Sequence, residues 1–381
     1  MSTDPVGDGL PVHPTFPSDR LSHNPDGPVL LVGGYGTVGA ELARLASPAW
    51  PLLLTGRSER RGAALAAELG DATVRRWDLA DPEPFGAAVR AVVGVVNDPD
   101  DRVLRAAVRA GVPYVDVTRW TARLQRAATL AALLRPTAPV LLSSAWMGGV
   151  TSLVAAALAD RLGGAERIET AVRWDLADRA GADSVEFMDR LGLDYEVVQD
   201  GLRRSVTPLS RPRTVRIGDS PTLVAGIDTP EQFTLPLTLG ATTATTRIGF
   251  SSRSSTTALL AARRAGFFRW GRGERWQGAR RALLYSPGEG GTARLRVDVG
   301  SGGRTLTATV EDRAGQARLT AVGALLALRR TLGTDGAPPP AGVAFPEQTP
   351  LPGRVLGALA ALDVTVTVSA ADGRPGTEAA A

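Results

Sequence analysis

The stretch VLLVGGYGTVGAEL, residues 29–42, decides the fold. An apolar run enters a cluster of glycines, and a segment with helical spacing of apolar residues leaves it. The spacing of Gly34, Gly36 and Gly39 between a strand and a helix is that of a dinucleotide-binding turn. In such a turn Gly34 allows the tight bend, Gly36 lets the backbone approach a pyrophosphate, and Gly39 lets the helix pack closely on the strand. We therefore expect a nucleotide here, with its phosphates at the N-terminus of the helix.

The region around this turn alternates strand-like and helix-like segments. Strands are expected at 29–34, 51–56, 73–79, 92–98, 114–117 and 139–145. Helices are expected at 37–46, 60–69, 85–91, 102–111 and 121–135. Repeated βα units of this kind form a doubly wound parallel sheet. The sequence thus predicts an α/β fold with a Rossmann-type domain over residues 28–148.

The rest of the chain has other patterns. Residues 149–320 lose the βα alternation and mix helices with several strands, which indicates a second, α+β domain for substrate binding and dimerisation. A homodimer is therefore expected. Residues 1–27 are rich in Pro, Asp, Ser and Gly and are expected to form a disordered tail. A second disordered tail is expected at residues 371–381.

The composition excludes several kinds of chemistry. The 381 residues include no cysteine, and the two histidines, His13 and His23, lie in the N-terminal tail. Neither a metal site nor a Ser-His-Asp triad is therefore expected. All 43 basic residues are arginine, so no enzyme amine is available for Schiff-base catalysis. There is no apolar run of about 18 residues and no signal-peptide pattern, so a cytoplasmic protein without a membrane span is expected.

The end of the second strand bears on the choice between the two nicotinamide cofactors. An NAD site places an acidic residue about 20 residues after the glycines, where it bonds the ribose 2′-hydroxyl. Here the strand ends in Thr55-Gly56-Arg57-Ser58, without a carboxylate. Arg57 and Ser58 suit a 2′-phosphate, so NADP(H) is predicted, although Arg57 could also be a solvated loop residue. Asp78, after the third strand, is a candidate acceptor for the adenine amino group or a cap for the segment that follows.

Several motifs beyond the turn have counterparts in a known family. They are GGYGTVG (33–39), TGR (55–57), VVND (95–98), DDRVLRAAVRAGVPYVDVT (100–118), SSAWMGGVTSLVAAALAD (143–160), PGEGG (287–291), LTATVED (306–312) and GVAFPEQTPL (342–351). Together they resemble the saccharopine dehydrogenase-like, NADP-binding oxidoreductases over most of residues 28–365. The later motifs resemble the bacterial branch that includes trans-acting enoyl reductases.

The resemblance implies which residues bind the cofactor. In such a fold the loops at the carboxyl ends of the strands lie near the nicotinamide. Asn97 and Thr118 in the loops after the fourth and fifth strands are therefore predicted to bind it. The turn residues Tyr35, Thr37 and Val38 are predicted to bind it together with the three glycines.

The same loops also depart from the family. Its members often read NCAGP and YVDxTGE where this chain has NDP at 97–99 and YVDVTRW at 114–120. Cofactor binding is thus implied by the resemblance, whereas the substrate is not. The family also implies that C-terminal elements, residues 321–370 here, return to pack near the Rossmann domain.

Catalytic candidates gather in WDLADRAGADSVEFMDRLGLDYE, residues 174–196. Because the chain lacks lysine and a histidine in its predicted core, its proton donors would be carboxylates, tyrosine or water. Asp183, Glu186 and Tyr195 are the predicted catalytic residues. Glu186 and Asp189 are three residues apart and could share a helix face, which could equally be a solvated acidic face.

The segment 262–285 interleaves seven arginines with Phe267, Phe268, Trp270 and Trp276. It could form the mouth of a site for an anionic or carrier-tethered substrate. It could bind a membrane surface or nucleic acid, or be an arginine face over packed aromatic rings. Nucleic acid is not expected as a partner, because a dinucleotide fold offers no element that reads a groove.

These observations predict a biosynthetic NADPH-dependent reductase that transfers hydride to the C=N bond of a small metabolite. The preference for C=N rests on the family resemblance. One alternative is a C=C (enoyl) reductase acting on a carrier-bound or lipid substrate. Another is a non-catalytic NADP(H)-binding sensor or scaffold, which the altered loops at Asn97-Asp98 and Arg119-Trp120 leave open.

Overall fold

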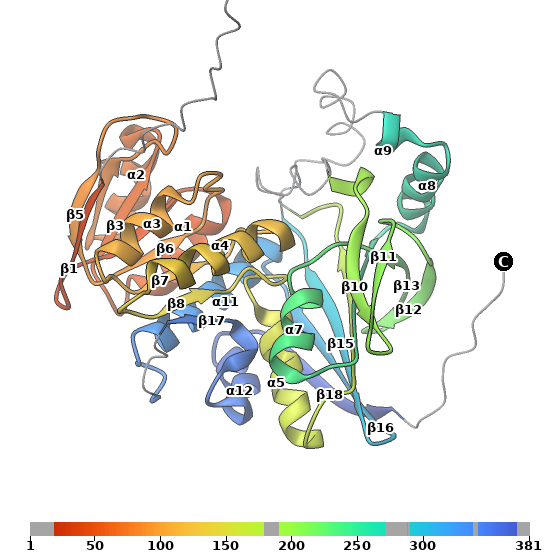
Figure 1. Ribbon diagram of the computed structural model, residues 1–381. Helices are drawn as coiled ribbons and strands as arrows, with labels where there is room; N and C mark the ends of the chain where they lie inside the picture. The colour runs from red at the N-terminus through yellow and green to blue at the C-terminus, as the bar shows by residue number, and fades with distance from the viewer. Residues whose placement is uncertain (1–18, 179–189, 271–287, 289, 338–341, 372–381) are drawn as a thin grey trace, which may run out of the picture.

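The computed structural model describes residues 19–178, 190–270, 288, 290–337 and 342–371. It shows two domains side by side, each built on its own sheet (Figure 1). The first has a parallel sheet with helices on both faces, and the second has a mixed sheet with helices packed against it. The predicted α/β fold, with a Rossmann-type sheet and a second α+β domain, is confirmed.

The sheet of the first domain has seven parallel strands. Their order across the sheet is β17-β8-β7-β6-β2-β3-β4. The strands are β2 (Val29–Val32), β3 (Leu52–Gly56), β4 (Ala72–Arg76), β6 (Ala91–Gly94), β7 (Tyr114–Asp116), β8 (Val140–Leu142) and β17 (Val343–Ala344). All four residues of β2 are buried, as expected for an apolar strand with helices on both faces.

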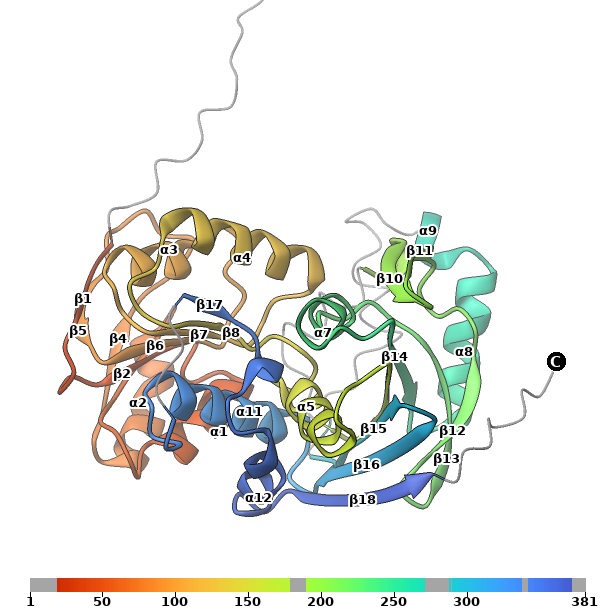
Figure 2. The ribbon, with the colours of Figure 1, turned by 60° about the horizontal axis from the view of Figure 1, so that its bottom comes forward.

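Helices cover both faces of this sheet (Figure 2). One face packs against α3 (Arg102–Arg109) and α4 (Thr121–Leu134). The other face packs against α1 (Thr37–Ala46), α2 (Glu59–Leu69) and α11 (Gln316–Thr331). The two resulting cores hold the ends of the strands in fixed positions, and the loops that leave those ends form the candidate site.

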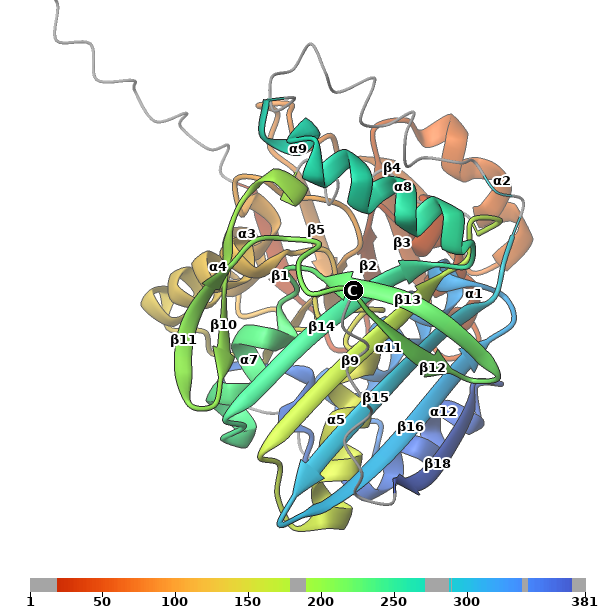
Figure 3. The same ribbon diagram turned by 90° about the vertical axis from the view of Figure 1, so that its right-hand side faces the viewer.

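The second domain has a nine-stranded sheet (Figure 3). Seven strands follow the order β11-β10-β14-β9-β15-β16-β18, and β13 joins β12 to β14. The strands are β9 (Arg167–Trp174), β10 (Tyr195–Gln199), β11 (Leu202–Val206), β12 (Arg213–Ile217), β13 (Ser220–Gly226), β14 (Thr243–Phe250), β15 (Ala293–Ser301), β16 (Arg304–Asp312) and β18 (Thr365–Ala371). In β15, buried residues alternate with half-buried ones, which is typical of a sheet with one covered face.

The covered face of this sheet packs against apolar helices. Helix α5 (Val150–Leu162) is buried almost all round, because it lies between the two domains. The other helices of this domain are α7 (Glu231–Leu239), α8 (Arg253–Arg264), α9 (Phe267–Trp270) and α12 (Val355–Ala360). Short 3-10 turns occur at η1 (Arg190–Gly192), η3 (Pro346–Gln348) and η4 (Pro352–Arg354).

Two predictions near the N-terminus are wrong for the same reason. Residues 20–23 lie in the predicted tail but form strand β1, which pairs in parallel with β5 (Gly86–Val89), where a helix was expected. The buried carboxylate of Asp19 holds this segment in place. It accepts two hydrogen bonds from Arg102, one from Nε and one from Nη2, each at 2.8 Å. Residues 1–18 lie outside the described residues.

The predicted boundary between residues 320 and 321 falls inside a helix. Helix α11 begins at Gln316 and packs on α1 of the first domain. Further along, β17 joins the first sheet, whereas β18 pairs with β16 of the second. The C-terminal elements therefore pack on both domains, and the prediction that they return to the Rossmann domain holds only for some of them.

Candidate functional site

The glycine-rich turn lies where the strand order of the first sheet reverses. From β2 the chain continues to β3 and β4 on one side, and then to β6, β7 and β8 on the other. In open α/β sheets this reversal leaves a crevice at the carboxyl ends of the central strands, where ligands bind. The turn after β2 and the loops after β6, β7 and β8 all open into this crevice.

The turn itself requires glycines because the backbone is crowded. Gly33 has φ +86°, a conformation that favours glycine. A Cβ on Gly39 would collide with the carbonyl oxygen of Gly33, so α1 packs directly on the turn. A Cβ on Gly34 would lie 2.9 Å from the carbonyl oxygen of Leu31. The tight bend thus falls on Gly33, one residue before the glycine predicted for it, and Gly34 is needed for close packing.

Tyr35 joins this turn to the next one. Its ring fills the space above Gly56 and Gly62, where any Cβ would collide with it. Its hydroxyl accepts a hydrogen bond from the backbone N–H of Ser58 at 3.0 Å. The ring of Tyr35 therefore positions the loop after β3, and its predicted contact with a cofactor stays a prediction.

The loop after β3 presents a cation without a carboxylate partner. Arg57 is exposed, and the structure gives it no ion pair with any described residue. The nearest acid in sequence, Glu59, instead accepts a hydrogen bond from the backbone N–H of Arg76 at 2.9 Å. Asp78 accepts one from the backbone N–H of Ala80 at 3.2 Å, which is a local turn rather than a helix cap.

A cavity of about 220 Å³ opens between this turn and the second domain. Thr37 and Val38 line it from the start of α1, and Thr118 lines it from the loop after β7. The backbone N–H of Thr118 donates to Asp116 at 3.0 Å. Three of the predicted cofactor residues thus share one cavity. Asn97 does not line it, and its side-chain oxygen accepts a hydrogen bond from Arg123.

A buried ionic network lies under the floor of this cavity. Arg119, which is 4% exposed, donates from Nε to Asp116 at 2.9 Å and from Nη1 to Asp101. Its Nη2 lies 3.9 Å from a carboxylate oxygen of Asp98 and has no hydrogen-bond partner among the described residues. Arg119 also lines the cavity, so this network contributes to the electrostatic environment of the cavity.

Three carboxylates share this one buried arginine, and one of them, Asp98, has a raised pKa. Burial raises the pKa of Asp98 to about 6, although Arg119 and two backbone N–H groups oppose the shift. Those N–H groups belong to Arg102 and Val103 and donate at 2.9 Å, so Asp98 also caps α3. Beside it, Tyr114 is fully buried and donates to Asp116 at 2.5 Å. A proton on Asp98 relieves the excess of negative charge.

The opposite wall of the cavity comes from the second domain. Asp228 accepts hydrogen bonds from Thr121 at 2.6 Å and from Arg190. The guanidinium carbon of Arg190 lies 4.9 Å from the ring centroid of Trp120, and that of Arg123 lies 4.1 Å from it. Both domains therefore meet at Asp228, and this end of the cavity offers a cation, a carboxylate and an aromatic surface.

Aromatic rings close the cavity further. Trp174, from the end of β9, packs edge-on against Trp146 with ring centroids 6.4 Å apart. Both rings line the cavity. Behind them, Glu231 is buried and accepts hydrogen bonds from the backbone N–H of Trp146 and the hydroxyl of Thr151, both at 3.3 Å. Burial raises the pKa of Glu231 to about 7.

Of the three predicted catalytic residues, the structure describes only Tyr195. Asp183 and Glu186 lie outside the described residues, as does much of the segment 262–285. Tyr195 does not line the cavity, and its hydroxyl lies against Gly226. Burial, and then the charge of Asp228, raises the pKa of Tyr195, so it is a poor proton donor near neutral pH.

Sequence reasoning missed several cavity residues. Arg119 appeared only as a departure from the family pattern, and Arg190, Asp228 and Trp174 did not appear as candidates. A signal existed for the buried network, because Asp98, Asp101 and Asp116 all lie at the carboxyl ends of neighbouring strands. For Asp228 no local signal exists, since its partners are 38 and 107 residues away.

Neither a metal-binding cluster nor a membrane-spanning helix occurs among the described residues. In the part of the chain that the structure describes, no group of three or more His, Cys, Asp or Glu could hold a metal ion. Within the same residues, no helix is long and apolar enough to cross a membrane.

The arrangement is that of a two-domain protein with a Rossmann-type first domain. It is similar to the apo histidine-tagged saccharopine dehydrogenase (L-Glu forming) from Saccharomyces cerevisiae, with a TM-score of 0.65 and 13% identity over 91% of this chain and 100% of that one. This likeness confirms the predicted resemblance at the level of the fold.

Weaker likenesses extend to other solved structures. C. glutamicum DAP dehydrogenase in complex with DAP has a TM-score of 0.40 and 13% identity, over 89% of this chain and all of that one. An engineered D-amino acid dehydrogenase bound to NADP+ has a TM-score of 0.39 and 12% identity, over 91% and 99%. No protein-family model matches the chain, and no curated protein matches its sequence.

Proposed function

We propose that the protein is an NADPH-dependent oxidoreductase that reduces a C=N bond of a small, anionic metabolite. The observation that supports this most is a single cavity with Thr37 and Val38, which directly follow the glycine-rich turn, on one wall and Arg190 and Asp228 of the second domain on the other. A nucleotide on the turn would direct its nicotinamide toward a substrate held at that second wall.

The residues at the turn fit the phosphates of a dinucleotide. No acidic side chain occupies the first turn of α1, so its free N–H groups and positive end face an anion without competition. The crowding at Gly39 indicates that the start of α1 packs directly on the turn, which supports a close approach of the backbone N–H groups to the phosphates. Arg57 and Ser58 would hold the 2′-phosphate, and Thr118 would lie near the nicotinamide. Bound NADPH would supply the hydride.

The far wall suits a charged imine. Arg190 would pair with a substrate carboxylate, and Asp228 would stabilise the positive charge of a protonated C=N group. Hydride adds to the carbon, the C=N bond becomes a C–N single bond, and the nitrogen keeps the proton with which it arrived. The described titratable side chains that line the cavity are Arg119, Arg190 and Asp228. They are two arginines and a carboxylate, with no tyrosine, histidine or lysine among them, which favours a substrate that needs no proton from the protein.

Hydride transfer can be tested with 1-pyrroline-2-carboxylate as the imine and a crotonyl thioester as the enoyl probe. We expect NADPH to be oxidised at least tenfold faster with the imine. With NADPH deuterated at the transferable position, the deuterium should appear on the carbon bonded to nitrogen. Arg190→Ala should raise KM for the carboxylated imine but not for uncharged 1-pyrroline, while Arg109→Ala, at the exposed end of α3, should change neither.

The other outcomes have distinct meanings. Faster reduction of the thioester would replace the C=N proposal with C=C reduction. Tight NADPH binding without oxidation by either probe would contradict hydride transfer to these substrate classes and favour a nucleotide-binding sensor or scaffold.

A further inference from the structure

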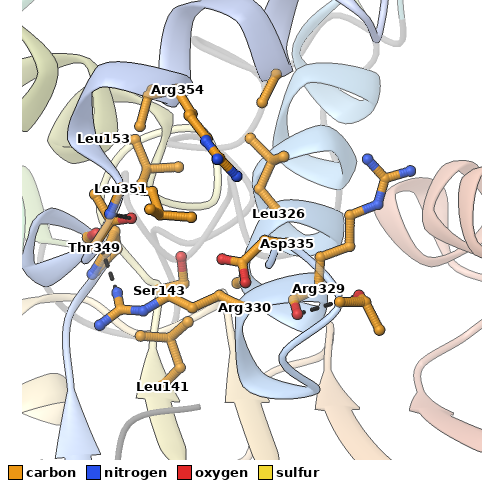
Figure 4. Close-up of a pocket in the computed structure, with 15 residues that line it drawn as sticks. Leu141, Ser143, Leu153, Leu326, Arg329, Arg330, Asp335, Thr349, Leu351 and Arg354 are labelled. Carbon is orange, nitrogen blue, oxygen red and sulfur yellow. Dashed lines mark hydrogen bonds between the residues drawn. The ribbon is translucent and has the colours of Figure 1, made fainter. Parts of the chain in front are cut away.

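A second cavity, of about 230 Å³, lies away from the nucleotide turn at the edge of the first sheet (Figure 4). Its apolar walls come from four elements that are distant in sequence. Leu141 belongs to β8, Leu153 to α5, Leu326 to α11, and Leu351 to the segment before η4. No residue of this cavity lines the first one.

Helix α11 shows how far apart the two cavities are. Its N-terminal residues Gln316 and Thr320 line the first cavity, whereas Leu326 and Arg330 line the second. Ten residues separate Thr320 from Arg330, which is about 15 Å along a helix axis. A small ligand therefore occupies one cavity without reaching the other.

The second cavity contains a buried arginine that forms no ion pair with any described residue. Arg330 is 5% exposed and donates only to backbone carbonyl oxygens, those of Phe345 (2.9 Å), Pro346 (3.3 Å) and Gln348 (2.6 Å). Its Nε–H has no hydrogen-bond partner among the described residues. Burial lowers the pKa of Arg330, and the negative charges of Asp335 and Glu347 offset this only in part. An anion bound in the cavity would stabilise the buried guanidinium further.

Further arginines increase the positive charge of the cavity. Arg354 is an exposed residue whose side chain points into the space between Leu153 and Leu326, and Arg330 runs below it (Figure 4). Arg329 lines the rim, and Asp335 is the single acid among the described lining residues. Three arginines against one aspartate leave an excess of two positive charges. Asp335 is itself engaged, because it accepts a hydrogen bond from the backbone N–H of Ala337 at 3.1 Å.

We propose that this cavity binds a small amphipathic carboxylate. The apolar body of the ligand lies against the leucines, and its carboxylate pairs with Arg354 and lies near the buried positive charge of Arg330. Walls of leucine disfavour a fully polar anion such as acetate or succinate, and the unpaired arginine disfavours an uncharged alcohol. This site is independent of the nucleotide site and of the proposed reduction.

Equilibrium dialysis of the full chain against labelled octanoate tests the proposal. We expect one octanoate per chain. Acetate, which has the charge without the apolar body, and octanol, which has the body without the charge, should each bind at least tenfold more weakly. Octanol binding as tightly as octanoate would overturn the role of the arginines, and no saturable octanoate binding would overturn the site.

Two variants locate the bound octanoate. Arg354→Glu changes an exposed residue and should weaken octanoate at least tenfold, whereas Arg109→Glu, at the exposed end of α3, should leave it unchanged. Ala358→Phe in α12 fills the cavity from its partly exposed side and should weaken octanoate as well. NADPH binding should be unaffected in all three, so a failure of the nucleotide proposal remains distinguishable. Octanoate binding that is unchanged in both Arg354→Glu and Ala358→Phe would contradict the assignment.

Discussion

The two walls of the nucleotide cavity are built in opposite ways. The wall at the turn presents the uncharged side chains of Thr37 and Val38 at an uncapped helix N-terminus, beside glycines that leave no room for a Cβ. The opposite wall is all side chain, with Arg190 paired to Asp228 and the ring of Trp120 between cations. Under its floor, Arg119 joins three buried carboxylates.

The difference suggests that one wall recognises the nucleotide and the other recognises the substrate. A surface of backbone N–H groups recognises phosphates whatever the rest of the ligand is, so it serves as a general nucleotide cradle. A surface of paired charges and rings distinguishes one small molecule from another. On this account, changes at the turn alter nucleotide affinity, and changes at the opposite wall alter stability, substrate choice and pH dependence.

The largest expected effect is at Arg119, beneath the cavity. Arg119→Met leaves Asp116 buried without its counter-charge and removes one of the two arginines that pair with Asp101, so it should lower the free energy of unfolding by about 3–5 kcal/mol. Arg126→Met is the matched control, because Arg126 contacts the same Asp101 but has a side chain that is 50% exposed. Its loss should cost at most about 1 kcal/mol in urea denaturation. Equal losses in the two variants would contradict the importance of burial.

Glu231 should make stability depend on pH. Its pKa is about 7 in the folded protein, above the ordinary 4.5, so the folded state keeps a proton that the unfolded state has lost. Stability should therefore fall as pH rises from about 4.5 to about 7, by on the order of 3 kcal/mol. Glu231→Gln should remove the Glu231 part of this slope from the urea-denaturation profile and leave the smaller fall below about pH 6 that Asp98 contributes, while Glu196→Gln, at an exposed position, should keep the full slope. An unchanged slope in Glu231→Gln would refute the assignment.

At the turn, the expected effects are on nucleotide binding. Gly39→Ala forces a methyl group onto the carbonyl oxygen of Gly33, which should cost about 1–3 kcal/mol and displace the start of α1. NADPH affinity by fluorescence titration should fall at least tenfold. Gly357→Ala places the same methyl group in α12 where no atom lies within 4 Å, and should be neutral or stabilising by up to about 1 kcal/mol. Wild-type affinity in Gly39→Ala would show that α1 does not bind the phosphates.

The fold was predictable because its signals are local. The apolar run 29–32 and the glycines after it define β2 and α1 within one short stretch. The wrong predictions fall where two segments that are distant in sequence pair as strands. Residues 86–89 have helical composition, yet they pair with residues 20–23, which looked like a tail. Only tertiary contacts such as Asp19 with Arg102 reveal this pairing.

The site was predictable on one wall only. Thr37, Val38 and Thr118 follow directly from the strand ends and line the cavity as a group. The opposite wall brings together Trp120, Arg190 and Asp228, whose positions in the sequence share no pattern. Charged residues are common on surfaces, so a sequence alone does not show which of them face one another across two domains.

The most direct test of the account is a titration of the protein with NADPH and NADH, with Arg57→Asp and Arg109→Asp in parallel. We predict that NADPH binds at least tenfold tighter than NADH, about 1.4 kcal/mol or more, and that Arg57→Asp loses this preference while Arg109→Asp keeps it. That result would place the 2′-phosphate at the loop after β3, where Arg57 is exposed without an acidic partner among the described residues. Equal affinity for the two nucleotides in the wild type, or a preference that survives in Arg57→Asp, would contradict it.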